Sequence, residues 1–267
     1  MISPLASIDP KAKLGREVTV LPFSYIAADV EVGDGCRIGP GAVLLDGARL
    51  GKNCTVDTGA VIAGLPQDLK FRGEYSTVVI GDNTRIREGV TINRGTAAKG
   101  VTSVGSNTLI MGYVHIAHDV TVGSNCVIVN SALLAGEVEV GDWAIISGHS
   151  AVHQFVHIGE HAMVSGGSLL SKDVPPYITV GHYPPSFMGV NFIGLRRRGF
   201  TSERVTEIQD ACRILFQSGY GYSKACDIIM ETIPQSRERD LLVNSVRSSK
   251  RGIIKPYNPA KEEEESL

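Results

Sequence analysis

The sequence predicts a mainly β protein, a parallel β-helix of six-residue repeats that is followed by a small C-terminal α-helical domain. Ile, Leu or Val recurs at every sixth residue from Ile8 to Ile62, then from Ile80 to Ile92, and without a break from Val104 to Leu170. A small side chain such as Cys36 often stands four residues after the apolar one. A Pro- and Gly-rich stretch at residues 174–189 ends the pattern, and helical periodicity follows it.

The length of the repeat determines the type of element. A period of six fits neither an α-helix, which repeats every 3.6 residues, nor a plain strand, which repeats every two. It fits short strands joined by tight corners, with one large and one small inward side chain on each side of a narrow triangular core. Three repeats make one coil, so residues i and i+18 are expected to stack about 4.8 Å apart. Glycine often follows the apolar residue, as in Leu14-Gly15 and Val122-Gly123.

Two stretches interrupt the register and divide the chain. We expect residues 1–186 to form the β-helix, with inserted loops at residues 63–79 and 93–103, and residues 187–267 to form the helical domain. Insertions in a repeat scaffold emerge as loops and often build its functional site. Hexapeptide repeats of this kind resemble those of left-handed parallel β-helices, and the resemblance implies a left-handed coil here.

The C-terminal region predicts three helices. The first is expected to begin after an N-cap at Thr201 or Ser202 and to end at Gly219. Ser223 is a candidate cap for a second helix, and a third is expected over about residues 236–249. A repeat scaffold needs a terminal cap, and these helices would provide one.

Composition narrows the class of protein. The formal charge of −2 argues neither for nor against an anionic partner, because local clusters can differ from the mean. No nucleic-acid partner is expected, and no run of apolar residues is long enough to predict a membrane span. Residues 1–30 lack a signal-peptide pattern, so the cytoplasm is expected. The five cysteines are odd in number and form no CxxC pair, which argues against a disulfide or zinc framework. Cys36 and Cys54 are expected to be packed, reduced thiols.

The densest cluster of chemically active residues is the segment His115-Ile116-Ala117-His118-Asp119. The histidines flank an inward Ile, so both rings are expected to point outward. Asp119 is placed to accept a hydrogen bond from one imidazole nitrogen of His118 and make the other more basic, as in an oriented general base. Gly136, 18 residues later, is expected to stack on His118 and to offer a backbone N–H to a developing oxyanion. From these residues alone, solvated histidines, an interfacial zinc site and a non-catalytic β-helix remain open.

A series of further motifs indicates one particular protein family. They are Gln67-Asp68-Leu69-Lys70, Ile86-Arg87-Glu88, Thr91–Thr96, Ala117-His118-Asp119, Ala151–Phe155, Asp173–Tyr177, Gly189-Val190-Asn191 and Gly194–Phe200. In order and spacing they resemble those of the UDP-N-acetylglucosamine O-acyltransferases. The resemblance covers nearly the whole chain, including both insertions and the helical region.

The resemblance implies a homotrimer that transfers an (R)-3-hydroxyacyl group from acyl carrier protein to the glucosamine 3-hydroxyl of UDP-N-acetylglucosamine, the first step of lipid A biosynthesis. It implies His118 as general base, Asp119 as its partner and the Gly136 N–H as oxyanion donor, with no cofactor and no metal. The residues implied to hold nucleotide-sugar or acyl-pantetheine groups are Gln67, Asp68, Lys70, His115, Glu137, His153, Gln154, Asn191 and Arg197.

The resemblance also implies a ruler for acyl-chain length at Gly166, with Met163 lining the groove. Because glycine leaves a groove open, we predict a preference for chains of about fourteen carbons or more. The competing reading is that Gly166 serves only a tight corner. The acidic acyl carrier protein is expected to land on the basic cluster Arg196, Arg197, Arg198 and Arg204.

Two departures from the family pattern leave alternatives open. The family often has His where this chain has Glu137, and Glu where this chain has Ile193. Sugar-nucleotide recognition is therefore the least determined part, and a related acyltransferase acting on a 3-amino sugar is one alternative. A γ-type carbonic anhydrase is the other.

Overall fold

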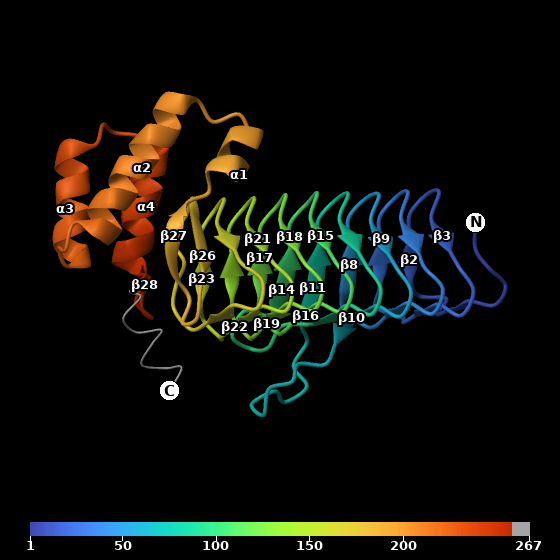
Figure 1. Ribbon diagram of the computed structural model, residues 1–267. Coiled ribbons are helices and arrows are strands. Elements are labelled where there is room, and N and C mark those ends of the chain that lie inside the picture. Colours follow the sequence, from blue (N-terminus) through green and yellow to red (C-terminus); the bar gives the residue numbers. More distant parts are fainter. Residues whose placement is uncertain (258–267) are drawn as a thin grey trace.

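The computed structural model describes residues 1–257 and contains three sheets that wind into one β-helix (Figure 1). Sheet I contains β1 (Ser7–Ile8), β4 (Tyr25–Ile26), β7 (Val43–Leu44), β10 (Val61–Gly64), β13 (Thr91–Asn93), β16 (His115–Ile116), β19 (Leu133–Leu134), β22 (Ala151–Val152) and β25 (Leu169–Leu170). Sheet II contains β2 (Lys13–Leu14), β5 (Glu31–Val32), β8 (Ala48–Leu50), β11 (Thr77–Ile80), β14 (Val101–Val104), β17 (Thr121–Val122), β20 (Glu139–Val140) and β23 (His157–Ile158). Sheet III contains β3 (Thr19–Val20), β6 (Arg37–Ile38), β9 (Thr55–Val56), β12 (Arg85–Ile86), β15 (Leu109–Ile110), β18 (Val127–Ile128), β21 (Ile145–Ile146), β24 (Met163–Val164), β26 (Ile178–Gly181), β27 (Ser186–Val190) and β28 (Lys255–Pro256).

The strands pair in parallel with the register that the repeat predicts. The chain visits sheets I, II and III in turn, and β16 pairs β19 with His115 opposite Leu133 and Ile116 opposite Leu134. In the two-residue strands of the coils the second side chain points inward, as Ile116 does at 0% exposure. Each such burial stabilises the fold by about 1.5–3 kcal/mol. The prediction of a parallel β-helix of hexapeptide repeats is confirmed.

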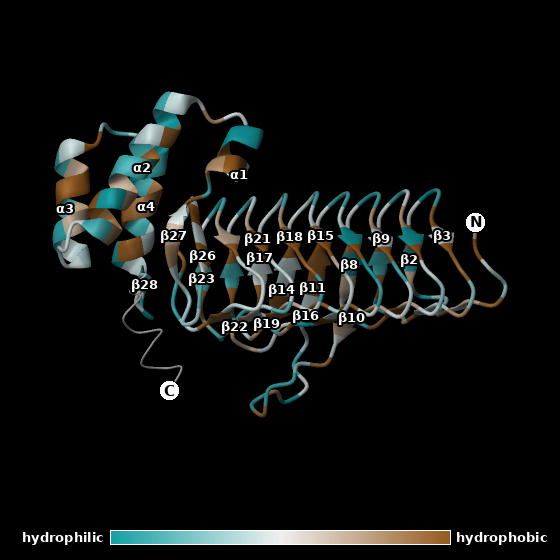
Figure 2. Cartoon of the chain, viewed as in Figure 1, coloured by the Kyte–Doolittle hydropathy of each residue, from teal (hydrophilic) through white to brown (hydrophobic). Residues whose placement is uncertain are grey.

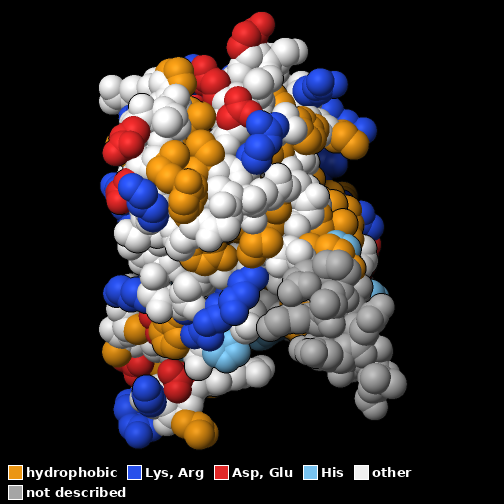
Figure 3. Space-filling model, turned by 60° about the vertical axis from the view of Figure 1, so that its left-hand side comes forward, with side chains coloured by type: hydrophobic (Ala, Val, Ile, Leu, Met, Phe, Trp, Pro, Cys, Tyr) orange, Lys and Arg blue, Asp and Glu red, His pale blue; other side chains and the backbone are white. Residues whose placement is uncertain are grey.

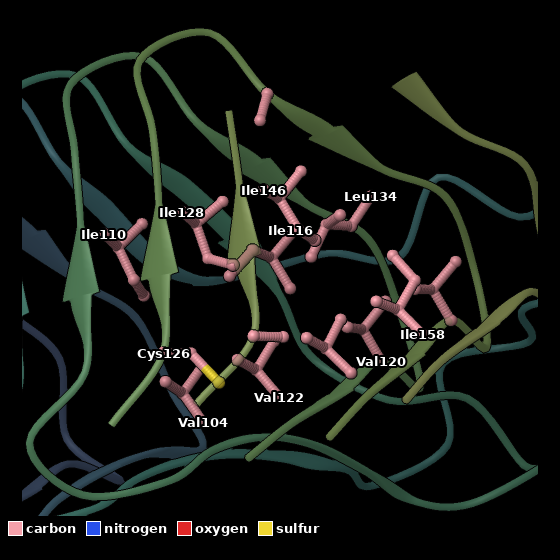
Figure 4. Close-up of a cluster of buried hydrophobic side chains, with 14 of the residues drawn as sticks. Val104, Ile110, Ile116, Val120, Val122, Cys126, Ile128, Leu134, Ile146 and Ile158 are labelled. Carbon is pink, nitrogen blue, oxygen red and sulfur yellow. The ribbon is translucent and has the colours of Figure 1, made fainter. Parts of the chain in front are cut away.

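The interior is a continuous column of aliphatic side chains. Figure 4 shows Ile110, Ile128 and Ile146 pointing inward from sheet III, with Ile116 and Leu134 of sheet I beside them. All five are fully buried. Figure 2 shows both brown, hydrophobic and teal, hydrophilic segments in the strands of the coils, and many turns that are hydrophilic.

The glycines that follow the inward residues of sheet II are explained by close stacking. A Cβ added to Gly105 would lie 2.6 Å from the carbonyl carbon of Gly123 in the next coil, which is too close for any side chain. The small inward residues also contact these glycines, because their side chains donate hydrogen bonds to the glycine carbonyls. Thr108 Oγ1 donates to Gly123 O at 3.1 Å, and Cys126 Sγ donates to Gly141 O at 3.2 Å. All five cysteines are buried and unbridged, in agreement with the prediction.

Three corners connect the sheets, and each is named after the sheets that it joins. Corner I/II includes the turns His118–Asp119, Gly136–Glu137 and Gln154–Phe155. Corner II/III includes Asp142–Trp143 and Glu160–His161. Corner III/I includes Pro22–Phe23, Gly112–Tyr113, Gly148–His149 and Gly166–Gly167.

Both insertions emerge at corner I/II. The structured strands reach further into them than predicted, so the loops span only residues 65–76 and 94–100. The reason is that Val78 and Ile80 of β11 already pair with β8, and β14 pairs with β11 from Val101 onward. The loop between β10 and β11 projects away from the β-helix (Figure 1).

The C-terminal region adds helices α1 (Phe192–Arg197), α2 (Ser202–Gln217), α3 (Tyr222–Thr232) and α4 (Arg237–Ser248). Thr201 caps α2, as predicted, by accepting from the Arg204 N–H, and Gly219 follows the helix with a φ of 78°. The helix predicted over about 236–249 is α4, capped by Ser236.

Two features of this region differ from expectation. Ser223 is not a cap, because α3 begins one residue earlier, after Gly221. The Tyr222 hydroxyl donates to Ile254 O at 3.1 Å, which fixes the start of the helix. The predicted boundary at residues 186/187 falls just inside β27, which pairs antiparallel with β26, and this division stays a prediction. In residues 1–257 no helix is both long and apolar enough to cross a membrane.

Candidate active site

The predicted His-Asp pair forms at corner I/II. His118 Nδ1 lies 2.8 Å from Asp119 Oδ2, and the Asp119 side chain is completely buried while the His118 side chain is 16% exposed. Asp119 occupies the left-handed region with a φ of 61°, which turns its carboxylate back toward the coil below. The bond engages Nδ1 and leaves Nε2 as the nitrogen that is available for proton transfer.

Asp119 is held by donors that the sequence pattern does not reveal. The Thr96 N–H and hydroxyl donate to its two oxygens at 2.9 and 2.7 Å, and the Lys99 N–H donates at 3.1 Å. Both residues lie in the loop 94–100, so this insertion builds a cradle for the carboxylate. The available signal was that this insertion lies one coil before the His-Asp pair, at the same corner. Burial alone would raise the pKa of the Asp119 carboxyl, but hydrogen bonds from His118, Thr96 and Lys99 outweigh it and hold that pKa below its ordinary value.

Gly136 lies directly against the imidazole of His118. A Cβ built on Gly136 would be 2.6 Å from both Cε1 and Nε2 of His118, so only glycine leaves room for the ring. The Glu137 N–H donates to His118 O at 3.0 Å and fixes the turn above it. Within residues 1–257, the Gly136 N–H donates to no acceptor. The residue whose amide N–H is unused therefore packs against the base nitrogen.

His115 lies on the outer face of sheet I, in strand β16, which leads into the turn that carries His118 and Asp119. Its Nδ1 is 2.7 Å from Thr91 Oγ1, on the neighbouring strand β13. Burial lowers the pKa of His115, so the neutral ring is favoured. A neutral ring held by one nitrogen has its other nitrogen available to a polar ligand.

The remaining predicted residues of corner I/II are more exposed. His153 and Gln154 are both exposed, and His153 Nδ1 lies 3.1 Å from Gln154 O. Gln154 stands two coils above His118, and Glu137 is half-buried beside Gly136. The structure therefore brings His115, His118, Asp119, Gly136, Glu137, His153 and Gln154 onto one edge of the β-helix.

Other predicted residues lie elsewhere in the same chain. Gln67, Asp68 and Lys70 lie on the projecting loop 65–76, where Asp68 Oδ1 accepts from the Lys70 N–H at 2.9 Å. Met163 faces outward from sheet III, and Gly166 lies at corner III/I. Within residues 1–257, no hydrogen bond or ion pair joins these residues to His118.

Asn191 and Arg197 lie at the two ends of α1, beyond corner II/III. Asn191 is buried; its Oδ1 caps α1 by accepting from the Gly194 N–H, and its Nδ2 donates to His161 O at 2.9 Å. Arg197 is exposed in the last turn of α1. Helix α1 is not predictable from the sequence, because a helix of six residues carries little periodic signal.

In residues 1–257 no group of three or more His, Cys, Asp or Glu side chains is arranged to hold a metal ion.

Comparison with known proteins gives two family matches. Residues 173–254 match the family described as "Udp N-acetylglucosamine O-acyltransferase; Domain 2". Residues 11–46 and 102–136 match the bacterial transferase hexapeptide repeat. The two matches cover the helical region and parts of the β-helix, respectively.

Relatives match over almost the full length. The acyl-[acyl-carrier-protein]–UDP-N-acetylglucosamine O-acyltransferase of Chlorobaculum parvum is 49% identical over 260 residues, covering 96% of this chain and 98% of the relative. That of Chlorobaculum tepidum is 59% identical over 215 residues, covering 79% and 81%. The crystal structure of a UDP-N-acetylglucosamine acyltransferase from Bacteroides fragilis superposes with a TM-score of 0.94 at 50% identity, covering 96% of this chain and all of the other.

Proposed function

The chain belongs to the UDP-N-acetylglucosamine O-acyltransferase family and is an acyltransferase of the first step of lipid A biosynthesis, and from this premise we propose which of its residues carry the reaction. The transferred group is an (R)-3-hydroxyacyl chain from acyl carrier protein, and the acceptor is the glucosamine 3-hydroxyl. The observation that carries the proposal is the His118-Asp119 pair packed against Gly136.

The proposed reaction is direct acyl transfer. Nε2 of His118 removes the proton of the sugar hydroxyl as its oxygen attacks the thioester carbonyl. The carbonyl becomes a tetrahedral oxyanion, which the Gly136 N–H stabilises. The intermediate collapses, the C–S bond breaks, and the imidazolium returns its proton to the leaving thiolate. Asp119 keeps the imidazole in the required tautomer and stabilises its positive charge.

The test is an acyl-transfer assay with purified protein, UDP-N-acetylglucosamine and 3-hydroxyacyl carrier proteins. Product formation with the 3-hydroxy sugar is expected. A parallel arm with the 3-amino analogue addresses Glu137 and Ile193, because transfer to the amine in preference to the hydroxyl would overturn the proposed acceptor. Zinc-dependent hydration of carbon dioxide without acyl transfer would overturn the whole proposal.

We also propose that the protein works as a homotrimer, because two of its three faces carry outward apolar side chains. On sheet III these are Leu109, Val127, Ile145 and Met163, and on sheet I they are Tyr25, Val43, Val61, Leu133 and Leu169. Sheet II presents mainly polar side chains, among them Lys13, Glu31, Arg49, Glu139 and His157, with Val79 as an exposed apolar one. At corner III/I, between the two apolar faces, Phe23 and Tyr113 are 71% and 69% exposed. Three β-helices packed around this corner would cover both apolar faces of each subunit and leave sheet II exposed to solvent.

Such packing would complete the site. Sheet I of one subunit would lie against sheet III of the next, so corner I/II of one would approach corner II/III of its neighbour. His118 and Gly136 would then meet Arg197 and Met163 of another copy, which explains why one chain keeps them apart. The projecting loop with Asp68 and Lys70 leaves corner I/II and is placed to reach across the same boundary.

Light scattering of the purified protein is expected to give about three times the 28.5 kDa mass of the chain. Val127→Arg, which puts a charge on the outer face of sheet III, is expected to lower the mass to that of a monomer and to abolish activity. Thr121→Arg on sheet II is the matched control and should stay trimeric. A stable wild-type monomer with full activity would exclude a shared site.

The acyl-chain ruler is proposed at Gly166, and the backbone supports it over the alternative of a tight corner. Gly166 has no positive φ, whereas the next residue, Gly167, has a φ of 71° and makes the turn. A Cβ at Gly166 would lie 3.3 Å from Gly148 O, which is tight but tolerable. Glycine at position 166 is therefore not demanded by the turn, which leaves an open groove as its reason.

Gly166→Met is expected to shift the chain-length preference toward shorter donors. A methylene buried in a groove contributes about 0.8 kcal/mol, so removing room for two carbons shifts the preference roughly tenfold. The measurement is competition between ten-carbon and longer 3-hydroxyacyl donors, with Gly166→Ala as an intermediate step. An unchanged preference in the Met variant would remove Gly166 from the ruler.

Two of the four arginines proposed to bind acyl carrier protein already have partners within the chain. Arg198 packs on Trp143 and His161, and Arg204 pairs with Glu207 and Glu238 at 2.7 and 3.4 Å. Arg196 and Arg197 remain exposed on α1. The end of the molecule that bears the helices displays Lys and Arg side chains at several places (Figure 3). We therefore propose Arg196 and Arg197 as the members of the cluster that meet the acidic carrier.

A further inference from the structure

One buried histidine has no part in the reaction described above. His161 lies at corner II/III with a φ of 57° and is 7% exposed. Its ring is parallel to that of Trp143 at a centroid distance of 6.2 Å, and it stacks on Tyr177 at 5.8 Å. Phe200 meets it edge-on at 5.1 Å. Such a ring has little freedom to move, which makes it a fixed point on the β-helix.

Both ends of α1 are bound to this one residue. At the start of the helix, Asn191 Nδ2 donates to the His161 carbonyl at 2.9 Å. At its end, Arg198 Nη1 lies 3.2 Å from His161 Nδ1. An arginine has only donors, so Nδ1 must accept this bond and carry no proton. The contact therefore requires the neutral tautomer with its proton on Nε2.

Arg198 is held from a second side as well. Its guanidinium lies over the Trp143 ring, 5.4 Å from the centroid, in a cation–π contact. Trp143 itself is parallel to His161. His161, Trp143 and Arg198 thus form one connected group that joins the β-helix to the end of α1.

We infer that His161 is the positioning residue for α1, fixing the helix by its carbonyl at one end and by its unprotonated Nδ1 at the other, so that Arg197 is presented to substrate. This inference rests on the proposed substrate-binding role of Arg197. It gives the neutral imidazole a function that phenylalanine, of similar shape, would lack.

The environment keeps His161 neutral. Burial, with the nearby charges of Arg198 and Arg237, lowers its pKa to about 4 from an ordinary 6.5, against the opposing effect of Asp142. Glu160, which faces this region, is paired with Arg237 at 2.8 Å. Because the unfolded chain binds the proton first, the arrangement is fully stable above about pH 6.5 and is lost as the pH falls through about 4.

Two variants distinguish the effect of the shape of the His161 ring from the effect of the hydrogen bond that its Nδ1 accepts. His161→Phe keeps an aromatic ring in the stack and removes the acceptor, whereas His161→Gln restores an acceptor oxygen. In the trimer without substrate, hydrogen exchange of residues 192–197 is expected to be about tenfold faster in the Phe variant and near wild type in the Gln variant, as for loss of one hydrogen bond to a charged group. The KM for UDP-N-acetylglucosamine is expected to rise about tenfold in the Phe variant with kcat changed less than about twofold.

Trp143 is the only tryptophan of the chain, so its fluorescence reports on this group directly. In wild type the fluorescence should titrate with a midpoint near pH 4, and His161→Phe should abolish that transition, while circular dichroism monitors the fold. His157→Phe, an exposed histidine on sheet II, is the matched control and should leave exchange, KM and fluorescence unchanged.

The outcomes separate the inference from the function on which it rests. Unchanged exchange of residues 192–197 in His161→Phe would overturn the inference, whatever the activity. Faster exchange with an unchanged KM would show that α1 carries no substrate-binding residue, and would overturn the role proposed for Arg197. A change in kcat equal to that in KM would likewise refute positioning of a binding group.

Discussion

His118→Ala is expected to lower kcat by about 10²–10⁴-fold, the usual contribution of a general base. The substitution removes Nε2, which packs against Gly136, and leaves the sugar hydroxyl without a proton acceptor. The KM values should change little, because the ring is proposed to act on the proton rather than to bind the sugar. Single-turnover acyl transfer at saturating donor and acceptor measures the effect.

Two controls accompany this variant: a test of its fold, and a substitution of a histidine outside the site. The mass and circular dichroism of His118→Ala should match wild type, because the side chain is partly exposed and points away from the core. His157→Ala should retain normal turnover. Turnover of His118→Ala within about threefold of wild type would remove His118 from the mechanism.

Gly136→Ala is expected to lower kcat by about 10²–10³-fold, although it adds only one methyl group. The new Cβ would lie 2.6 Å from Nε2 of His118, so the ring must swing away and break the 2.8 Å bond to Asp119. The base then loses both its orientation and its place beside the oxyanion donor. The measurement is again kcat, with the pH-rate profile recorded in parallel.

Gly221→Ala is the matched control, because no atom lies within 4 Å of an added Cβ there and the φ of −63° suits alanine. It should leave turnover unchanged. If Gly136→Ala behaved like this control, the ring of His118 would have to lie elsewhere during turnover, and the proposed arrangement of base and oxyanion donor would fail.

The β-helix could be predicted almost completely from the sequence because its signal is local and repeated. Each inward residue, such as Ile116 or Leu134, recurs at a fixed spacing, and the pairing register follows from counting. The loop limits were less accurate, since apolar residues such as Val78 belong to strands although the preceding loop obscures their register. Helix α1 was missed because its six residues are fixed by contacts with His161 and not by their own periodicity.

Only some of the site residues could be predicted from the sequence, and there is a physical reason why the others could not. His118, Asp119 and Gly136 follow from the stacking of one corner, so a sequence that reveals the coil also reveals their proximity. The Thr96 and Lys99 donors depend on how an irregular loop folds back, which no periodicity encodes. Residues such as Asp68 and Arg197 depend on how separate copies pack, so neither the repeat nor a single chain fixes their distance from His118.

The last strands of sheet III have a consequence for self-assembly. A stack of nearly identical coils resembles a short segment of a fibre, because a first coil could in principle continue the last coil of another copy. Here β26 continues sheet III past the ends of sheets I and II, and β27 then runs antiparallel to it. The three sheets therefore do not end in one plane, and no second chain can add a coil in register on all of them. Growth of this kind along the axis therefore stops at the C-terminal end of the β-helix, which favours sideways association.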